Sequence, residues 1–473
     1  MRVAVETSHS FRLCFRTMDD TDGSLPALAI IADDLTGAAD SGAPFASAGF
    51  STAILVDPSW CTESPTAQPG PNREALSCLL PGLPELTQGV LVVNTDSRRL
   101  SPEKAAYATQ RGVAIARAAG HRRFYKKIDS QFRGNVAVEL ASGMKALNVT
   151  GCLLAPAFPE QERTTVEGRC FVRGKPILDQ TIADFLESSG FSAASVTLTD
   201  PPEYGKALAE LDSRALRSDG SQAPRLLLAN AWEREHLRDL ARSALLLSGD
   251  RHLLAGSGGF AGALAERLAQ STPERHPDLS LEKTRSVRVL PQSDGSLHLT
   301  PGAFPPAPAG MPRNRGVLII SGSRSEEARR QIYELRRYRD AEVCIVDSSG
   351  SANQGKVQDA VLRGALGIVA PNTSRTIAGA SEKVAEVAAS VLSAVITGSM
   401  ISAAPHVLFV GGETAMATLR LLEAPLIVIG GEIESGIASG WIPRSACGTL
   451  AISTKAGAFG DNETLLRIVE AVG

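Results

Sequence analysis

Short apolar segments that alternate with helical patterns are the feature that most constrains how this chain can fold. Apolar runs that end in polar turns, as expected of buried strands, occur at 89–100, 152–159 and 316–323. Residues 101–120 and 381–396 instead place apolar side chains at the spacing of an amphipathic helix. Strands that alternate with helices favour parallel pairing. The sequence therefore predicts an α/β fold with mainly parallel sheets and flanking helices.

A break in composition divides the 473-residue chain into two predicted domains. Residues 271–314 are rich in Pro, Ser, Gly and Arg, which is typical of a linker or insertion, and two short apolar pieces within them are expected to pair as a hairpin. We expect one domain over 26–270 and a second over 315–473, where the strand–turn–helix pattern restarts. Residues 1–25 lack such a pattern and lack the apolar core of a secretory signal, so we expect a flexible N-terminal extension.

Composition and charge exclude several classes of function. The net charge of −3 and the pI of about 6.2 give no reason to expect binding to nucleic acid or to an anionic membrane. No apolar run approaches the ~20 residues of a membrane span. The seven Cys residues are dispersed without CxxC spacing, which indicates reduced thiols and a cytoplasmic protein. Neither HExxH nor GxSxG occurs, so we predict no metal ligands and no hydrolytic triad.

Two adjacent carboxylates follow the first predicted strand. Asp33 and Asp34 stand where an apolar run ends and a helical pattern begins, within residues 31–50. Ligands of open α/β sheets bind outside the carboxyl ends of the strands. Adjacent carboxylates repel each other and resist burial, so they suit hydroxyl recognition, a general base or a metal ion. The structural alternative is that Asp34 caps the helix and Asp33 is solvated.

Four further polar clusters follow predicted strands in the first half of the chain. They lie at 94–98, 126–135, 155–164 and 230–233. The densest is 126–135, which contains Lys127, Asp129, Ser130, Arg133 and Asn135. Arginine forks bind carboxylates, lysine binds carboxylate or phosphate, and the uncharged and acidic side chains can recognise hydroxyls. The set suits a small, anionic, hydroxylated substrate, although a solvated turn with surface ion pairs is the simpler reading of any one residue.

Glycine-containing turns between strand and helix recur in the rest of the chain. They lie at 256–259, 321–323 and 411–414, and a fourth glycine-rich segment at 453–461 includes Lys455. Backbone N–H groups at a helix N-terminus favour phosphate, but glycine also serves close packing of helix on sheet. None of these turns has the GxxxxGK[ST] or GxGxxG pattern of the common nucleotide-binding motifs.

Nine short motifs run through the chain in a fixed order. They are IADDLTGAAD (31–40), NTDSR (94–98), KKIDSQFRGN (126–135), PAFPEQERTTVEGRCFVRGKPI (156–177), GSGGFA (256–261), SGSRS (321–325), GGETA (411–415), GEIESGIASG (431–440) and TKAGAFG (454–460). In content, order and spacing they resemble the four-carbon acid sugar kinase family, whose members phosphorylate threonate, erythronate or 3-oxo-tetronate with ATP. The resemblance extends from about residue 27 to residue 470.

This resemblance implies an N-terminal acid-sugar-binding domain, a C-terminal nucleotide-binding domain and an active-site cleft between them. It implies ATP and Mg²⁺ as cofactors and a terminal hydroxyl of the acid as the acceptor. The implied catalytic residues, one of which accepts the hydroxyl proton with Asp33 slightly favoured, are Asp33, Asp34 and Asp129. The implied substrate-binding residues are Arg98, Lys127, Ser130, Arg133, Asn135 and Arg163. The implied ATP-binding residues are Ser257, Gly411, Gly412, Glu413, Thr414 and Gly457.

The chain departs from the family pattern at several positions. Gln131 and Phe132 replace the usual Thr and Leu, and Ala456 replaces a Ser. The changes at Gln131 and Phe132 bear on which acid is bound, and together with Ala456 they leave two alternatives open, a kinase of a different polyol acid and a non-catalytic sugar-acid-binding protein. An aldolase or dehydrogenase acting on such acids is a third rival, but the nicotinamide fingerprint is absent. Whether the chain forms a homodimer is also left open.

Overall fold

A computed structural model describes most of the two predicted domains. The described residues are 28–58, 89–189, 195–215, 225–245, 252–271, 289–291, 297–299, 316–348, 350–372, 379–398, 404–443 and 450–473. The predicted N-terminal extension lies outside the described residues, as does most of the 271–314 linker. Within that linker, β12 (Val289–Pro291) and β13 (Leu297–Leu299) pair antiparallel, which confirms the expected hairpin.

Strands and helices alternate in the N-terminal half. The elements are β1 (Leu28–Ala32), α1 (Leu35–Ser47), β2 (Thr52–Leu55), β3 (Val90–Asn94), α3 (Pro102–Ala118), β4 (Arg123–Lys127), α4 (Val136–Leu147), β5 (Gly151–Ala155), η3 (Pro159–Gln161), β6 (Arg163–Val166), β7 (Arg169–Val172), β8 (Lys175–Pro176), α5 (Ile182–Ser188), β9 (Ser195–Thr199), η4 (Pro201–Glu203), α6 (Tyr204–Ala215), β10 (Arg225–Ala229), α7 (Arg234–Ala244), β11 (His252–Gly256) and α8 (Gly258–Gln270).

The same alternation continues in the C-terminal half. The elements are β14 (Val317–Ser321), α9 (Glu326–Tyr338), β15 (Ala341–Asp347), β16 (Gly350–Ala352), α10 (Gln354–Leu362), β17 (Leu366–Pro371), α11 (Ala380–Gly398), β18 (His406–Val410), α12 (Gly412–Leu421), β19 (Leu426–Glu434), β20 (Ile437–Ile442), β21 (Leu450–Lys455) and α13 (Thr464–Val472). None of the helices in the described part of the chain is long and apolar enough to cross a membrane.

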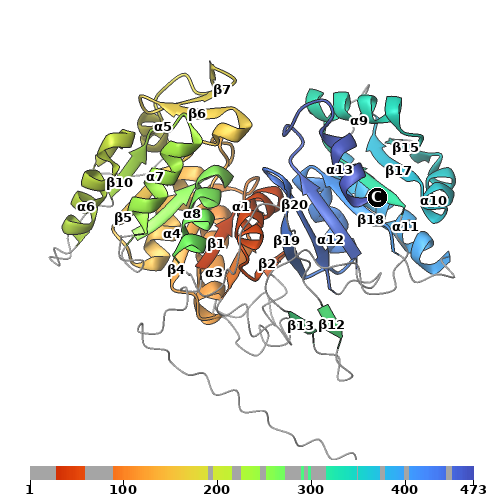
Figure 1. Ribbon diagram of the computed structural model, residues 1–473, viewed down its shortest axis with the longest axis horizontal. Coiled ribbons are helices and arrows are strands. Elements are labelled where there is room, and N and C mark those ends of the chain that lie inside the picture. Colours follow the sequence, from red (N-terminus) through yellow and green to blue (C-terminus); the bar gives the residue numbers. More distant parts are fainter. Residues whose placement is uncertain are drawn as a thin grey trace, which may run out of the picture.

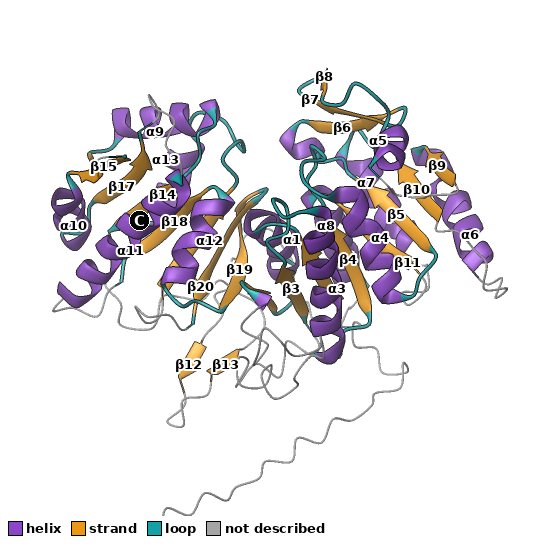
Figure 2. Cartoon of the chain, turned by 180° about the vertical axis from the view of Figure 1, so that it is seen from behind, coloured by secondary structure: helices purple, strands orange, loops and turns teal. Residues whose placement is uncertain are grey.

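The prediction of a mainly parallel α/β fold is confirmed, but the sheet is continuous through both halves. Its sixteen strands run in the order β16-β15-β17-β14-β18-β21-β20-β19-β2-β3-β1-β4-β11-β5-β10-β9. Antiparallel pairing is confined to β15–β16 and to the run β2–β19–β20–β21. The two halves meet where β2 pairs with β19, near the centre of the molecule (Figure 1). Seen from behind, helices flank the sheet in both halves (Figure 2).

Some strands were not predicted from the sequence. They are β9, β16, β17 and the separate three-stranded sheet of β6, β7 and β8. The sequences of β6 and β9, RTTV and SVTLT, are too polar to form the apolar run that identifies a buried strand. β17 follows α10 after a short turn, so its apolar residues merge with those of the helix in the sequence pattern.

Helix α1 packs closely over the junction between the halves because it consists largely of small residues. A Cβ atom at Gly42 would lie 3.1 Å from Val92 Cγ2 and 3.2 Å from Thr52 Cγ2, so α1 packs directly against β2 and β3 at this position. One hydrophobic cluster includes Ala43 of α1 together with Met416 of α12 and residues of β19. The shared core places the N-terminus of α1 beside the C-terminal half.

Gly440 offers a test of the β19–β20 pairing that extends the sheet into the C-terminal half. A Cβ atom there would lie 2.1 Å from the backbone oxygen of Val428. Strand backbone cannot yield as the end of a flexible side chain can, so Gly440→Ala should destabilise the fold by roughly 2–3 kcal/mol. Thermal unfolding measures the effect.

The matched control is Gly205→Ala in α6, where an added Cβ atom would meet nothing within 4 Å. This substitution should leave the unfolding midpoint unchanged or raise it, by at most about 1 kcal/mol of stability. Equal midpoints for Gly440→Ala and the wild type would contradict the pairing.

Candidate active site

The predicted carboxylate pair lies at the end of β1. Asp34 is the N-cap of α1, with extended φ and ψ of −147° and 163°, and its Oδ1 accepts a hydrogen bond of 2.8 Å from the Gly37 amide. The capping role proposed as the structural alternative is therefore present. Asp33 is only 2% exposed, so the other part of that alternative, a solvated Asp33, is wrong.

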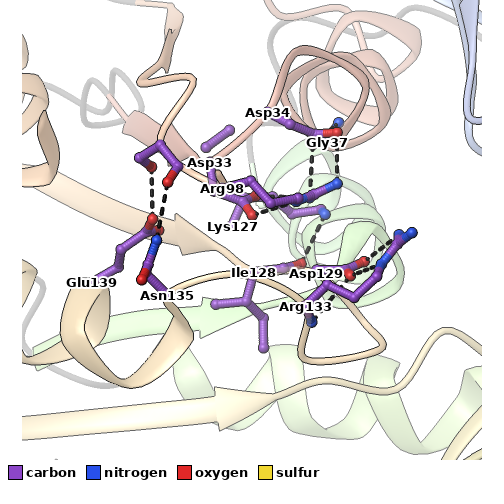
Figure 3. A network of polar contacts seen from close by, with 12 residues as sticks. Asp33, Asp34, Gly37, Arg98, Lys127, Ile128, Asp129, Arg133, Asn135 and Glu139 are labelled. Carbon is purple, nitrogen blue, oxygen red and sulfur yellow. Dashed lines mark hydrogen bonds and ion pairs between the residues drawn. The ribbon is translucent and has the colours of Figure 1, made fainter. Parts of the chain in front are cut away.

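Arg98, in the turn that follows the neighbouring strand β3, binds both carboxylates. Its Nε donates to Asp33 Oδ2 and its Nη1 to Asp34 Oδ2, each at 2.7 Å, while Nη2 reaches both residues at 3.0 and 2.9 Å (Figure 3). The backbone oxygen of Asp33 accepts hydrogen bonds from the amides of Ser97 and Arg98, which fixes the turn that carries the guanidinium. We call this arrangement of Asp33, Asp34 and Arg98 the Arg98 clamp.

The Arg98 clamp keeps Asp33 ionised. Burial acts to raise the pKa of Asp33, but Arg98, with smaller contributions from Lys126 and Lys127, lowers it to about 2. Because the Arg98 guanidinium is hydrogen-bonded to both Asp33 and Asp34, its positive charge offsets much of the repulsion expected between the two carboxylates.

The end of β4 supplies the next group of predicted residues. Lys127 is buried, and its Nζ donates to Ile128 O at 2.9 Å and lies 3.7 Å from Asp40 Oδ1. Asp129 accepts hydrogen bonds from Nε and Nη2 of Arg133 (Figure 3). Burial acts to raise the pKa of Asp129, but the hydrogen bonds from Arg133 and the charge of Arg98 lower it below its ordinary value.

The remaining predicted substrate residues have different surroundings. Ser130 is buried in the turn between Asp129 and Arg133. Asn135 donates to the backbone oxygens of Ser97 at 3.1 Å and of Leu100 at 2.9 Å, so its amide nitrogen holds the turn that carries Arg98. Arg163 begins β6 and lies close enough to Asp129 and Arg133 for their charges to act on its pKa; its contacts to the C-terminal half are described below.

Three charged residues near the site were not predicted from the sequence. Lys126 and Glu139 form a 2.7 Å ion pair with both side chains 2% exposed, and Ser97 Oγ donates to Glu139 at 2.6 Å. Asp40 lies on α1 opposite Lys127, and burial raises its pKa to about 6, although the positive charge of Lys127 opposes the shift. Lys126 and Asp40 lie within the motifs at 126–135 and 31–40, and the helical spacing of Asp40 from Gly37 could have singled it out as a residue on the same face of α1.

In the C-terminal half, the ends of three neighbouring strands come together. β14, β18 and β21 are adjacent in the sheet, and they end at the predicted glycine turns. Gly411 has a φ of 103°, and a Cβ atom there would lie 3.5 Å from Ser323 N. A Cβ atom at Gly457 would lie 2.1 Å from Ser323 Oγ, so the turns after these three strands are in contact.

This cluster has the properties of an anion site. The hydroxyls of Ser321 and Thr414 are buried without a hydrogen-bond partner among the described residues. Lys455 is fully buried, its Nζ donates to Ala456 O at 2.8 Å, and burial lowers its pKa to about 7. The N-terminus of α12 adds unpaired backbone amides and the positive end of a helix dipole. Phosphate oxygens would satisfy these donors.

The residues around the Arg98 clamp and the glycine turns of the C-terminal half are in contact at the N-termini of α1 and α12. A Cβ atom at Gly412 would lie 3.2 Å from Asp34 Oδ2 and 3.3 Å from Thr36 Oγ1. Next to this contact, Arg99 Nη1 lies 2.7 Å from Glu413 Oε2. A phosphate held by the amides of α12 would therefore stand beside the carboxylate pair.

Ser257 is not part of the C-terminal cluster. It follows β11, which adjoins β4, and it is the N-cap of α8 in the N-terminal half. Its hydroxyl donates to Ala157 O at 2.5 Å and accepts from the Gly259 amide at 3.1 Å. The structure thus places Ser257 on the side of Lys127, apart from Gly411, Gly412, Glu413, Thr414 and Gly457.

A protein-only metal site is not formed by the described residues. No group of three or more His, Cys, Asp or Glu side chains among them is arranged to hold an ion. Glu413, which lies at the N-terminus of α12, is 58% exposed and paired with Arg99. Mg²⁺ commonly binds through one or two carboxylates together with substrate phosphates and water, and that mode would fit this donor set.

Comparisons with known proteins agree with the two halves. The model of a sugar-binding N-terminal domain matches residues 28–264, and the model of a nucleotide-binding C-terminal domain matches residues 318–465. The chain is 26% identical over 467 residues to a D-threonate kinase of Salmonella typhimurium, covering 92% of this chain and 96% of the relative.

Two further proteins extend the comparison. A 3-oxo-tetronate kinase of Pectobacterium atrosepticum is 23% identical over 470 residues, covering 93% of this chain and 98% of the relative. The crystal structure of Haemophilus influenzae protein HI1011 is similar with a TM-score of 0.61 at 16% identity, covering 94% of this chain and 100% of that protein. At this identity, the similarity to HI1011 supports the fold alone.

Asp40 allows a test of the electrostatics of the site. Its pKa of about 6 in the folded protein exceeds the ordinary value of 3.8, so the stability that its protonated form contributes is complete below pH 3.8 and is lost as the pH rises through 6. Asp40→Asn cannot ionise. Relative to the wild type, it should therefore gain on the order of 2 kcal/mol of stability between pH 4 and pH 7.5.

Thermal unfolding of both proteins across this pH range measures the gain. Asp359→Asn, at an exposed position of α10, is the control and should follow the wild type at every pH. A difference between Asp40→Asn and the wild type that does not change with pH would mean that Asp40 has an ordinary pKa.

Proposed function

Because this chain belongs to the four-carbon acid sugar kinase family, we propose that it transfers the terminal phosphoryl group of ATP to a terminal hydroxyl of a four-carbon sugar acid. The observation that carries the proposal is the contact between the carboxylate pair and the N-terminus of α12, at Gly412. Phosphoryl transfer needs an acceptor hydroxyl and a phosphate held in line, with the developing charge neutralised. The contact would place the carboxylate that binds the acceptor hydroxyl beside the turn that binds the phosphate.

Asp34 is the carboxylate that we assign to the acceptor hydroxyl. Both Asp33 and Asp34 are held by Arg98, but the side chain of Asp34 is the more exposed of the two and the one nearest Gly412. Asp33, with a pKa of about 2, then serves chiefly to fix Arg98. A carboxylate at the position of Asp34 would orient the hydroxyl and accept its proton as the phosphoryl group is transferred. The sequence slightly favours Asp33 as the proton acceptor, whereas the geometry favours Asp34.

The C-terminal cluster would hold the phosphates of ATP. Backbone amides of the 411–414 turn, the Thr414 hydroxyl and the Lys455 ammonium group are the donors available there. A bound phosphate would favour the charged form of Lys455, whose pKa burial lowers to about 7. Mg²⁺ carried with the nucleotide would neutralise phosphate charge, and Glu413 is the side chain best placed to contact its water shell.

The basic residues of the N-terminal half would bind the carboxylate of the acid. Arg163 is the strongest candidate because no carboxylate of the described residues forms an ion pair with it, whereas Arg133 is paired with Asp129 and Lys127 faces Asp40. Asp129 and Ser130 are then available for the hydroxyls of the acid.

The departures from the family motif differ in their consequence for specificity. Phe132 adopts a φ of 58° and packs into the hydrophobic core, with its ring 5.5 Å from that of Phe185. It therefore acts through the shape of the turn, and Gln131 is the departure that is free to contact the substrate. Relatives named for D-threonate and for 3-oxo-tetronate make both acids candidates.

The remaining predictions concern location and assembly. Cys152, Cys170 and Cys344 are free and buried, which is compatible with the predicted cytoplasmic location. A homodimer stays a prediction that sedimentation would test.

Asp34→Asn tests the assignment of the acceptor carboxylate. Asn caps a helix as well as Asp does, so the fold should persist. The kcat should fall by at least ~100-fold because the hydroxyl loses its proton acceptor, while the dissociation constant for ATP changes by less than about threefold. Asp359→Asn serves as the control with unchanged kinetics. Turnover of Asp34→Asn at the wild-type rate would remove Asp34 from the mechanism.

The function itself is tested by ADP release from Mg-ATP with a panel of D- and L-threonate, D- and L-erythronate and 3-oxo-tetronates. At least one of these acids should give acid-dependent ADP release and a monophosphorylated product. Binding of an acid without ADP release would instead identify a non-catalytic sugar-acid-binding protein. Activity with only a longer or differently substituted polyol acid would identify a kinase of another substrate.

A further inference from the structure

The aromatic ring of Phe459, in the C-terminal half, contacts residues on the sugar-acid side of the molecule. Phe459 lies on the turn after β21 and is 8% exposed. Its ring lies edge-on to Phe158, with centroids 5.9 Å apart at 82°, and the Arg163 guanidinium carbon stands 4.7 Å from the Phe459 centroid. Phe158 and Arg163 both belong to the N-terminal half, so this contact joins the two halves beside a predicted substrate-binding residue.

Arg163 is a buried cation without a carboxylate partner. It is 5% exposed, and none of the ion pairs among the described residues includes it. Its Nη1 donates to the backbone oxygen of Gln161, while its buried Nε has no hydrogen-bond partner in the described part of the chain. Burial lowers the pKa of Arg163, and the nearby charges of Arg133 and Arg173 act in the same direction, against Asp129.

Such a cation needs compensation. A desolvated charge without an anion is strongly unfavourable, and the face of an aromatic ring supplies part of the missing stabilisation. The ring accepts no N–H···O hydrogen bond, and Nη1 donates to Gln161 O while Nε has no partner in the described part of the chain. Arg163 therefore retains a donor for the carboxylate of a ligand.

The position of Phe459 is fixed by the nucleotide-binding half. Its backbone oxygen accepts a hydrogen bond of 2.9 Å from Gln331 Nε2, and its amide donates to Ala456 O at 3.1 Å. A Cβ atom at Gly436 would lie 2.7 Å from the Phe459 ring, so only glycine leaves room for it there. The same turn contains Gly457, whose oxygen accepts from Ser325 Oγ at 3.0 Å and from Lys455 Nζ at 3.3 Å.

We propose that Phe459 is a positioning residue for the sugar acid, which orients the Arg163 guanidinium toward the carboxylate of the substrate from across the junction between the halves. The inference rests on the proposed function of the site. Since the 455–459 turn also carries the Lys455 contact to Gly457, occupation of the phosphate site and of the acid site is coupled through it. By thermodynamic linkage, nucleotide then raises acid affinity by the same factor by which acid raises nucleotide affinity.

The experiment compares Phe459→Leu, which keeps apolar volume but removes the ring, with Phe459→Tyr, which keeps the ring. Calorimetry measures the affinity of each full-length protein for D-threonate, or for the acid that the wild type turns over, with and without ADP. Phe459→Leu should bind the acid about 3- to 20-fold more weakly, with ADP affinity in the absence of acid changed less than about twofold. Phe459→Tyr should bind the acid with about the affinity of the wild type.

A control and a double-mutant cycle separate positioning from a loss of packing. Phe50→Leu removes an equally buried ring, 6.3 Å from Phe45, and should leave acid affinity unchanged. In an Arg163→Ala background, Phe459→Leu should cause no further loss of acid affinity, because the ring acts through Arg163.

Three results would overturn the inference. They are wild-type acid affinity in Phe459→Leu, an equal loss in the Arg163→Ala background, and equal weakening of acid and ADP binding. The first two would leave the proposed function intact if the wild-type protein phosphorylates the acid. A wild-type protein that neither binds nor phosphorylates any acid of the panel would contradict both.

Discussion

The Arg98 clamp is the interaction on which the rest of the site depends. Two adjacent carboxylates at the buried end of β1 would lose their charge or distort the turn if no cation satisfied them. The guanidinium fork meets both because β3 lies beside β1 in the sheet, and the backbone oxygen of Asp33 holds the turn that carries Arg98. Asn135 braces the same turn from the next strand–helix connection. The position of Arg98 is therefore set jointly by its ion pairs, by the order of the strands and by the hydrogen bonds of its turn.

The second constraint is the continuous sheet, which joins the half that carries the carboxylate pair to the half that carries the glycine turns. The small residues of α1 allow it to lie close to β2 and β3, and this places Asp34 beside Gly412 of α12. Further contacts cross the junction at Arg99–Glu413 and at Arg163–Phe459. Each half by itself therefore holds an incomplete site. The proposed phosphate site and the proposed hydroxyl site would become productive only through this juxtaposition, as in kinases that close around both substrates.

Much of the fold and site could be predicted from the sequence, and the failures have physical causes. Strand exits, glycine turns and the carboxylate pair are local patterns, so β1, β4 and β18 and their polar turns were found. β6 and β9 were missed because their stability comes from tertiary pairing rather than from an apolar run. The burial of Asp33, the Lys126–Glu139 pair and the raised pKa of Asp40 depend on contacts between distant segments. Phe459 in the TKAGAFG motif gave no signal of its contact with Arg163, which lies almost three hundred residues earlier.

A crystal structure with a non-hydrolysable ATP analogue and the acid that the wild type phosphorylates tests the central claim most directly. We predict that the terminal phosphate lies at the amides of the 411–414 turn and that one substrate hydroxyl is hydrogen-bonded to Asp34, in line with that phosphate. An acid bound away from the Arg98 clamp, or a terminal phosphate bound away from the N-terminus of α12, would contradict the account.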